Sequence, residues 1–239
     1  MPCPSCESKL EKPFGEKNSY HLTCCQNCGL IYVENMPSNE VLHDFYQNYH
    51  KTSQYTAKLD SKLRRAKKRI KCIKKYTQGK RFIDVGCNAG FAVEAARICG
   101  FDAQGVDVDG KTIALAKKFF PEACYQSKSI QKIAAEGQQF DLIYCSEVLE
   151  HLPSLHDFVK ALYDGLDKNG VLYLTTPDIG HYSLPGNTEK LLKWDAVRPP
   201  EHLYYFSRKS LQYLFLQAGF SKLKFQFNFK PTLKLLAWK

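Results

Sequence analysis

Residues 82–90 read Phe-Ile-Asp-Val-Gly-Cys-Asn-Ala-Gly, and this stretch decides the fold. Its first four residues continue a short buried strand predicted over 81–85, and the glycines then open a turn into a helix predicted over 91–99. Gly86 lets the backbone approach a ligand closely, and Gly90 lets the helix start tight against the strand. This D-x-G-x-x-x-G spacing is weak evidence alone, because a dinucleotide fingerprint is G-x-G-x-x-G and Asn88 stands where a second glycine would help.

Strand and helix signals alternate from this stretch towards the C-terminus. Further strands are predicted at 103–107, 123–126, 140–145, 171–175 and 222–227, and helices at 111–120, 154–166 and 207–219, the last two capped by Ser154 and Ser207. Repeated units of this length predict an α/β fold with a doubly wound, mostly parallel sheet. Residues 177–200 are the longest irregular stretch and follow a strand, which is where such sheets build substrate sites.

Polar residues follow two of these predicted strands. Asp107 ends the second strand, where a carboxylate can accept hydrogen bonds from both hydroxyls of a ribose. His151 follows the fourth strand and is the candidate catalytic base, with a hydrogen-bonding core histidine as the alternative. His202 is a second candidate, with anchoring of the neighbouring 177–200 stretch as its alternative.

The first 28 residues contain five of the ten cysteines. Two Cys-x-x-Cys pairs, 18 residues apart, fit the spacing of a structural zinc site, in which two tight turns close a tetrahedral shell; the predicted ligands are Cys3, Cys6, Cys25 and Cys28. Cys24 is a rival to Cys25, but it would change the second pair to Cys-x-x-x-Cys. The scattered cysteines further along the chain are predicted to be reduced core thiols.

Most of the net charge lies in one segment. The chain has a formal charge of +10, and residues 58–75 hold ten Lys/Arg and one Asp. Within this window apolar residues recur at steps of three and four, which predicts a helix with one basic face and one packing face; they are Leu59, Leu63, Ala66, Ile70 and Ile73. One basic helix is weaker evidence for nucleic-acid binding than a basic protein would be.

Four segments in order resemble the motifs of class I S-adenosylmethionine-dependent methyltransferases. They are IDVGCNAGF (83–91), GVDVDGKTIALAK (105–117), FDLIYCSEVLEHL (140–152) and GVLYLTTP (170–177). The segment PPEHLYYFSRKSLQYLFLQAGF (199–220) resembles the branch of ubiquinone-type O-methyltransferases and tailoring enzymes of bacterial polysaccharide clusters. An N-terminal zinc ribbon and a linker similar to PSNEVLHDFY (37–46) are common in that branch. The resemblance covers most of residues 1–228.

The resemblance implies site residues for S-adenosylmethionine. The glycine loop would line its methionine part and Asp107 its ribose, with Val108 beside the adenine, Ser129 and Ile130 at the adenine edge, and Ser146 and Glu147 below the sulfonium. In the loop itself the implied residues are Asp84, Gly86, Cys87, Asn88 and Gly90. Two departures stand out: Asn88 replaces a glycine, and the family's last antiparallel strand must fit into 232–238 or be absent.

These observations predict a zinc-ribbon module at 1–33, a helical linker or lid at 34–79 and a methyltransferase domain at 80–239. In the linker, Tyr46 and Tyr49 could close over the cofactor, with packing residues of a linker helix as the alternative. The predicted function is methyl transfer from S-adenosylmethionine to a small-molecule acceptor, with a hydroxyl oxygen as the target. The alternative is an RNA or protein methyltransferase that holds its substrate with the zinc module and the basic helix. No stretch resembles a signal peptide or a membrane-spanning helix, so a cytoplasmic location is expected.

Overall fold

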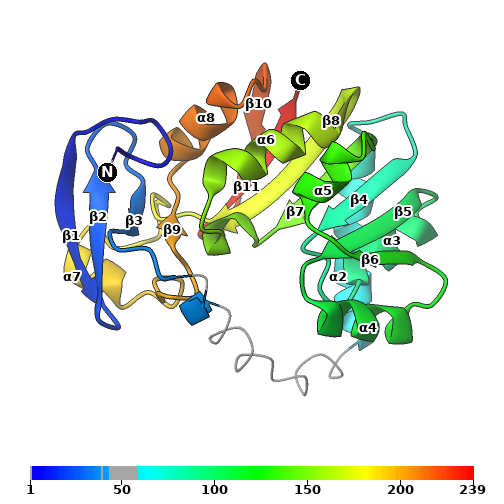
Figure 1. The fold of residues 1–239 in the computed structure, drawn as a ribbon, viewed down its shortest axis with the longest axis horizontal. Coiled ribbons are helices and arrows are strands. Elements are labelled where there is room, and N and C mark those ends of the chain that lie inside the picture. The colour runs from blue at the N-terminus through cyan, green and yellow to red at the C-terminus, as the bar shows by residue number, and fades with distance from the viewer. Residues whose placement is uncertain (1, 39, 43–58) are drawn as a thin grey trace.

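The computed structural model describes residues 2–38, 40–42 and 59–239. Its centre is a seven-stranded sheet in the order β10-β11-β8-β7-β4-β5-β6 (Figure 1). The strands are β4 (Arg81–Val85), β5 (Asp102–Asp107), β6 (Cys124–Ser127), β7 (Phe140–Ser146), β8 (Leu166–Pro177), β10 (Lys222–Phe225) and β11 (Thr232–Trp238). The first five are parallel to one another, whereas β11 is antiparallel to β8 and β10 is antiparallel to β11. The predicted Rossmann-like α/β fold is confirmed, and the last antiparallel strand is present as β11.

Helices cover both faces of this sheet. They are α2 (Leu59–Lys74), α3 (Phe91–Ile98), α4 (Gly110–Phe119), α5 (Ile130–Ala135), α6 (Leu155–Gly165) and α8 (Arg208–Gln217). Successive residues of β4 point to opposite faces of the sheet. Phe82 packs with α2 and α3, whereas Ile83 packs in the core that holds α5, α6 and α8. Burial of both faces explains the nearly continuous apolar strands of the sequence.

Local signals set most of the helix starts. Ser207 and Ser210 form a capping box at α8, and Ser129 and Asp109 accept backbone N–H groups at the starts of α5 and α4. Ser154 stands at the N-cap position of α6 but does not cap it, because its hydroxyl donates to Asp157 Oδ2 at 2.9 Å. The stretch 177–200 is less irregular than predicted, since it contains the short helix α7 (Thr188–Leu192) behind Asn187.

A second, four-stranded antiparallel sheet contains β1 (Glu11–Lys17), β2 (Tyr20–Cys25), β3 (Ile31–Val33) and β9 (Tyr204–Tyr205). Its fourth strand therefore comes from the segment just before α8, and it pairs Ile31 with Tyr205 and Tyr32 with Tyr204. Figure 1 shows β1, β2 and β3 at one end of the molecule, with α7 beside them. The predicted helix over the basic segment is confirmed from Leu59 onward, with Ile70 and Ile73 buried, whereas Tyr46 and Tyr49 lie outside the described residues. Among the residues that the structure describes, no helix combines the length and the apolar character that crossing a membrane requires.

Candidate cofactor and acceptor site

The carboxyl ends of β4, β5, β7 and β8 meet at one edge of the large sheet. The register pairs Val85 with Val106 and Cys145, and Ser146 with Thr175. The glycine loop, Asp107, the Ser146–Glu147 pair and the segment after β8 therefore share this edge. Ligands of doubly wound sheets bind at this position.

The glycine loop is a tight turn that other residues could not make. Gly86 and Gly90 have positive φ angles of 74° and 80°. A Cβ at Gly86 would lie 2.5 Å from Val148 Cγ2, and one at Gly90 would lie 2.5 Å from the Tyr125 hydroxyl oxygen. Asn88 also has a positive φ, 47°, which asparagine tolerates better than most residues, and its side chain accepts from Ala89 N at 2.6 Å. Asn88 thus replaces a glycine without changing the left-handed turn.

Asp107 is held in place by two backbone donors. Its Oδ2 accepts from Asn88 N and its Oδ1 accepts from Asp109 N, each at 3.0 Å. These bonds fix the orientation of the carboxylate at the mouth of the glycine loop. The neighbouring Val108 side chain is 77% exposed, so it presents apolar surface beside the carboxylate.

Three other predicted cofactor residues are more deeply placed. Asp84 is buried, and burial together with the charge of Asp107 raises its pKa to about 8, against the opposing charge of Arg69. Cys87 is also buried, and burial is the main cause that raises the pKa of its thiol. Ile130 lies in the core and Ser129 caps α5, which leaves the Ile130 backbone rather than its side chain for an adenine.

Ser146 and Glu147 join a polar network at the end of β7. The Ser146 and Thr175 hydroxyls are 2.7 Å apart, and Thr175 donates to Glu147 Oε1 at 2.8 Å. Arg69 of α2 donates to the Tyr144 hydroxyl at 2.5 Å and lies 3.5 Å from Ser146 Oγ. The sequence analysis did not single out Arg69, because the regular basic helix around it concealed the one arginine that turns towards the strand ends.

Glu150, His151 and His202 form a cluster on the same side. Glu150 is 0% exposed; its Oε2 accepts from Thr176 at 2.9 Å, and its Oε1 has no hydrogen-bond partner among the residues described. Burial, with the charge of Glu147, raises the pKa of Glu150 to about 8. The two imidazole rings meet edge to face with their centroids 4.7 Å apart. Sequence order concealed this contact, since His202 belongs to a different segment of the chain.

The two histidines differ in what they offer chemically. His151 Nδ1 is 2.7 Å from Glu201 O, and since a carbonyl only accepts, this nitrogen carries the proton and Nε2 the lone pair. Burial lowers the pKa of His151 to about 4, so it is neutral near pH 7. His202 has Nδ1 2.8 Å from Ala196 O and Nε2 3.2 Å from Arg198, and burial lowers its pKa to about 3. Both nitrogens of His202 are thus engaged, which places it as support behind His151.

The same three side chains also have the composition of a metal site. One ligand atom from each of Glu150, His151 and His202 lies within 4.8 Å of the others. The guanidinium of Arg198 occupies one side of the cluster, bonded to His202 and paired with Glu201 at 3.0 Å. A positive group in this position opposes the binding of a cation.

An exposed group of aromatic rings lies at the same edge of the sheet. Tyr182, Phe227 and Phe229 are 68%, 70% and 80% exposed, and Phe227 contacts both of the others. His181 joins the two segments, because its Nε2 lies 3.0 Å from Asn228 O. Neither segment shows a periodic pattern in the sequence, so this group was not predicted.

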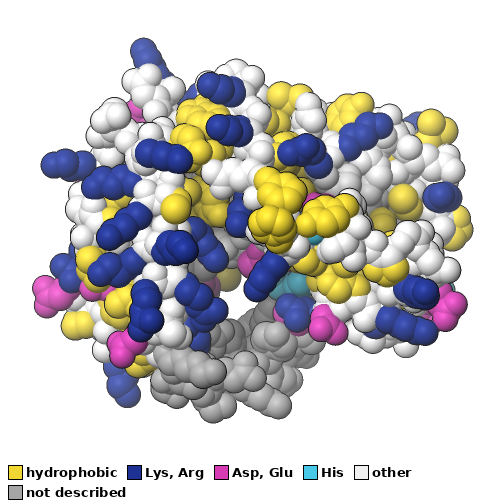
Figure 2. Space-filling view, turned by 180° about the vertical axis from the view of Figure 1, so that it is seen from behind, with side chains coloured by type: hydrophobic (Ala, Val, Ile, Leu, Met, Phe, Trp, Pro, Cys, Tyr) yellow, Lys and Arg dark blue, Asp and Glu magenta, His cyan; other side chains and the backbone are white. Residues whose placement is uncertain are grey.

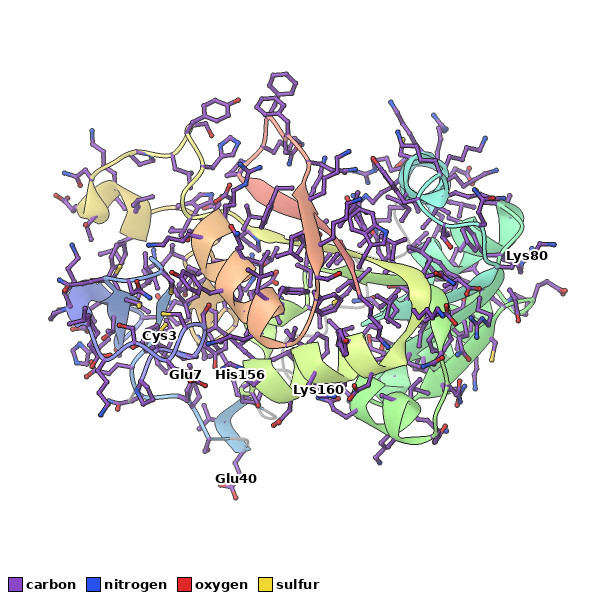
Figure 3. All side chains as sticks on the ribbon, turned by 90° about the horizontal axis from the view of Figure 1, so that it is seen from above. Cys3, Glu7, Glu40, Lys80, His156 and Lys160 are labelled. Atoms are coloured by element: carbon purple, nitrogen blue, oxygen red, sulfur yellow. The ribbon has the colours of Figure 1, made fainter. Side chains whose placement is uncertain are left out.

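The four predicted zinc ligands come together in the N-terminal sheet. The Sγ atoms of Cys3 and Cys28 are 3.5 Å apart, those of Cys6 and Cys25 are 3.6 Å apart, and all four lie within 4.8 Å of one another. Tetrahedral zinc with Zn–S bonds of about 2.3 Å requires sulfurs about 3.8 Å apart, so the donor set fits this ion. Cys24 lies outside the group, with its thiol directed to Cys25 O. Figure 3 shows Cys3 far from Lys80, which precedes β4.

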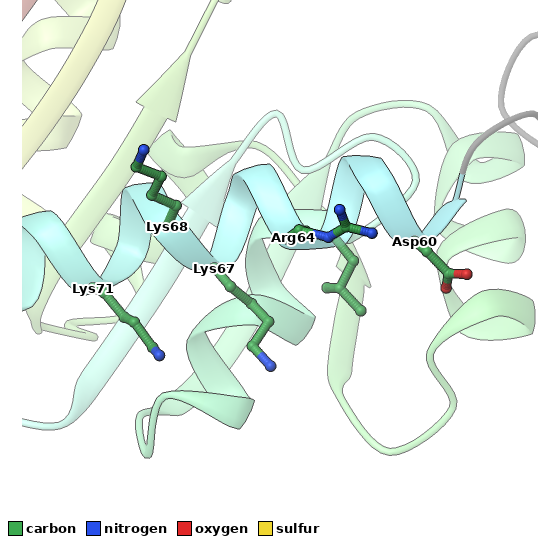
Figure 4. Close-up of a pocket in the computed structure, with 6 residues that line it drawn as sticks. Asp60, Arg64, Lys67, Lys68 and Lys71 are labelled. Atoms are coloured by element: carbon green, nitrogen blue, oxygen red, sulfur yellow. The ribbon is translucent and has the colours of Figure 1, made fainter.

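The basic face of α2 lines a shallow depression that is separate from these groups. Figure 4 shows the charged side chains of α2 that line it; with Leu63 they are Asp60, Arg64, Lys67, Lys68 and Lys71. It holds neither the carboxylate and glycines of the cofactor edge nor a histidine. Figure 2 shows Lys and Arg side chains spread over most of one face of the molecule rather than gathered in a single patch.

Comparisons with known proteins show the family and the fold of this chain. Residues 54–224 match the family model described as a methyltransferase domain, and the chain belongs to this family. Its relatives include ubiquinone biosynthesis O-methyltransferases from Glaesserella parasuis serovar 5, 28% identical over 107 residues, and from Bordetella avium, 31% identical over 104 residues. Each alignment covers 41% of this chain and 45% or 43% of the relative. The chain thus matches less than half the length of these curated relatives.

Solved structures show the same fold at low sequence identity. A SAM-dependent methyltransferase from Archaeoglobus fulgidus superposes with a TM-score of 0.59 at 16% identity, covering 74% of this chain and 94% of that one. Magnesium protoporphyrin IX methyltransferase from Synechocystis PCC 6803, solved with bound SAM, gives a TM-score of 0.51 at 17% identity and covers 85% of each chain.

Proposed function

We propose that this protein transfers a methyl group from S-adenosylmethionine to a hydroxyl oxygen of a small molecule. The observation on which this rests is the glycine loop facing the Asp107 carboxylate, which two backbone N–H groups hold in place. Membership of the methyltransferase-domain family supports the reaction type. The names of the curated relatives support an oxygen acceptor, and the exposed rings near the site suit an acceptor with an apolar or planar part.

The cofactor-binding roles that we propose are those implied by the resemblance to class I methyltransferases, and the placement of each group supports them. Asp107 would accept from the ribose hydroxyls and Val108 would cover the adenine, while Gly86 and Gly90 admit the methionine part to the backbone. Asp84, with its raised pKa, would ionise when an ammonium group comes close, since a nearby positive charge favours the carboxylate. Ser146 and Glu147 would border the transferred methyl, and Arg69 offers a positive charge beside them.

His151 is our candidate for the base. The cofactor supplies an electrophilic methyl on a good neutral leaving group, so positioning of the acceptor can account for roughly 7–11 kcal/mol of the barrier. Neutral His151 would accept the hydroxyl proton at Nε2, because Glu201 O fixes the proton on Nδ1. A base of this kind typically adds about 10²–10⁴-fold. His202 would hold the His151 ring in place through the edge-to-face contact.

The N-terminal cysteine group would hold one structural zinc ion. Four thiolates close the coordination shell and leave no position for a reacting water, so we assign it no catalytic step. Asn27 Nδ2 and Cys28 N each lie 3.5 Å from a cysteine sulfur and would stabilise the thiolates. A cytoplasmic location remains a prediction.

Calorimetric titration with S-adenosylmethionine tests the cofactor site. The Asp107→Ala variant should lose about 1.5–3 kcal/mol of binding, the usual worth of hydrogen bonds to a charged group. Asp102→Ala is the matched control, since Asp102 is an exposed carboxylate at the opposite end of β5. Equal affinities in the two variants would contradict the proposed site. Offering methyl-labelled cofactor to small-molecule, RNA and protein fractions then identifies the acceptor class.

A further inference from the structure

We propose that the N-terminal cysteine module, residues 2–33, positions His151 by clamping the segment 198–207, which we name the bridge segment. The module then acts as a brace for the acceptor side of the site. This inference rests on the proposed roles of His151 and of zinc. The cysteine module and the His151 site, which are far apart in the sequence, then depend on each other structurally.

The module holds one side of the bridge segment. Val33 N donates to Leu203 O at 3.0 Å and Asn18 Nδ2 donates to Pro199 O at 2.8 Å. Ser207 Oγ donates to the carbonyl of Cys28, one of the four clustered cysteines, at 3.1 Å. The pairing of β3 with β9 lies between these contacts. The module therefore contacts the bridge segment along most of its length.

The candidate catalytic residues contact the other side of the same segment. Leu203 N donates to Glu150 O at 2.8 Å, and Glu201 O accepts from His151 Nδ1 at 2.7 Å. The Tyr204 hydroxyl donates to Pro153 O at 3.1 Å. Leu203 is thus bonded to Val33 through its carbonyl and to Glu150 through its N–H, so one residue joins the module to the histidine site.

Burial makes this connection stiff. Residues 201–206 are all buried, with exposed fractions of 7% or less. Close-packed interiors transmit displacement, since there is no space to absorb it. The bridge segment has only the two residues of β9 as regular structure, so its position depends on the groups on either side of it.

The four cysteines determine whether the module can act as a brace. Cys25 ends β2 and Cys28 lies in the turn between β2 and β3, and this turn bonds to the bridge segment through Cys28 O. Small metal modules gain much of their folding free energy from the bound ion. Without the ion this turn and β3 lose their anchor, and the Glu201 carbonyl that holds His151 is no longer fixed from behind.

The experiment compares the protein carrying Cys25→Ser and Cys28→Ser with a Cys24→Ser control. Cys24 is the adjacent thiol outside the cluster. Readouts are zinc content, hydrogen exchange of the Leu203 amide, the nitrogen-15 resonance of His151 Nδ1, and affinity for S-adenosylmethionine. We expect the double variant to lose zinc, to exchange Leu203 at least tenfold faster and to shift the His151 resonance, with cofactor affinity changed less than twofold. Cys24→Ser should match the wild type.

A second pair of variants keeps the cysteines intact. Ser207→Ala removes the bond to Cys28 and one helix cap, whereas Asn187→Ala removes the cap of α7. Only Ser207→Ala should shift the His151 resonance, and this comparison decides the matter if the double cysteine variant does not fold. An unchanged Leu203 amide and His151 resonance in a zinc-free, folded protein would overturn the brace. If the purified wild-type protein contains no zinc, the brace does not depend on a metal ion. Failure to bind S-adenosylmethionine would instead contradict the proposed function.

Discussion

Glu150 is a carboxyl group without solvent exposure, in contact with Thr176 and close to His151. Its pKa of about 8 in the folded chain lies above the ordinary 4.5, so between these values the folded protein keeps a proton that the unfolded chain releases. The free energy of unfolding therefore falls as the pH rises through this interval, by at most about 1.4 kcal/mol per pH unit. Above the folded pKa this loss is complete.

We expect Glu150→Gln to remove this dependence. Between pH 7 and pH 9 the wild type should lose about 1 kcal/mol more of its unfolding free energy than the variant, as measured by urea denaturation. Asp84 has a similar shift and contributes equally to both proteins. Glu136→Gln is the control, because Glu136 is exposed and pairs with Lys128, which lowers its pKa. A variant that follows the wild-type pH profile would mean that Glu150 is ionised in the folded state.

His151 should matter for turnover and not for cofactor binding. With an acceptor in hand, His151→Ala should reduce kcat by about 10²–10⁴-fold while the affinity for S-adenosylmethionine stays the same. His156→Ala, an exposed histidine on α6, controls for loss of an imidazole. A loss below tenfold would make His151 a packing residue rather than the base.

The residues that could be predicted from sequence share one property: their chemistry demands a fixed local spacing. The two Cys-x-x-Cys pairs, the glycine loop and Asp107 belong to this group. Arg69 and the rings of Tyr182, Phe227 and Phe229 could not be predicted, since their roles depend on which side of an element faces the site. The engagement of both His202 nitrogens is likewise visible only in three dimensions.

At the scale of the elements, the turn between β4 and α3 has no space for an added methyl group at Gly90. Gly90→Ala should destabilise the protein by about 2–4 kcal/mol, since the left-handed backbone costs roughly 1 kcal/mol and overpacking against Tyr125 costs about 1–3 kcal/mol more. Gly137→Ala is a matched control, because Gly137 has a φ of 74° and a Cβ added there would meet nothing within 4 Å among the described residues. Equal unfolding free energies in the two variants, measured by urea denaturation, would show that the loop relaxes around a methyl group.

We expect the unfolding free energy to depend on the apolar side of α2 and not on the charges of its exposed face. Replacing Arg64, Arg65, Lys67 and Lys68 with Gln should change the unfolding free energy by about 0.5 kcal/mol or less, since surface substitutions rarely do more. The control Ile70→Ala removes a side chain buried against the sheet and should cost about 2–5 kcal/mol. Tight RNA binding that falls steeply with salt and disappears in the Gln variant would favour a macromolecular substrate.

Strand and helix boundaries were predictable where the periodic pattern was long. The predictions for β4, α3, α4 and β7 agree with the structure to within one residue at each end. The two-residue β9 and the five-residue α7 were missed, because such short elements contain no complete period. β8 starts earlier than predicted, at Leu166, because the polar residues 167–169 interrupt the apolar pattern of the strand.

At the scale of the whole molecule, the sequence predicted a zinc module and a methyltransferase domain but not how they meet. Pairing between β3 and β9 is non-local, and neither strand contains a signal that names its partner. Hydrogen bonds from Ser5, Lys17 and Asn18 to Ser210, Leu192 and Pro199 extend the contact. The four-stranded sheet therefore draws on two regions that the sequence analysis assigned to separate domains.

The late arrival of β9 also has a consequence for synthesis on the ribosome. Cys28 and Ser207, which bond across this junction, are 179 positions apart. At about 5–20 residues per second, β3 leaves the ribosome roughly 10–35 s before the strand that will cover its edge. During that interval the nascent chain presents an unpaired strand edge, the kind of surface on which chains aggregate. Slowing translation downstream of β3 should therefore lower the soluble yield of this protein, and early capture of zinc by the nascent cysteines would not close that edge.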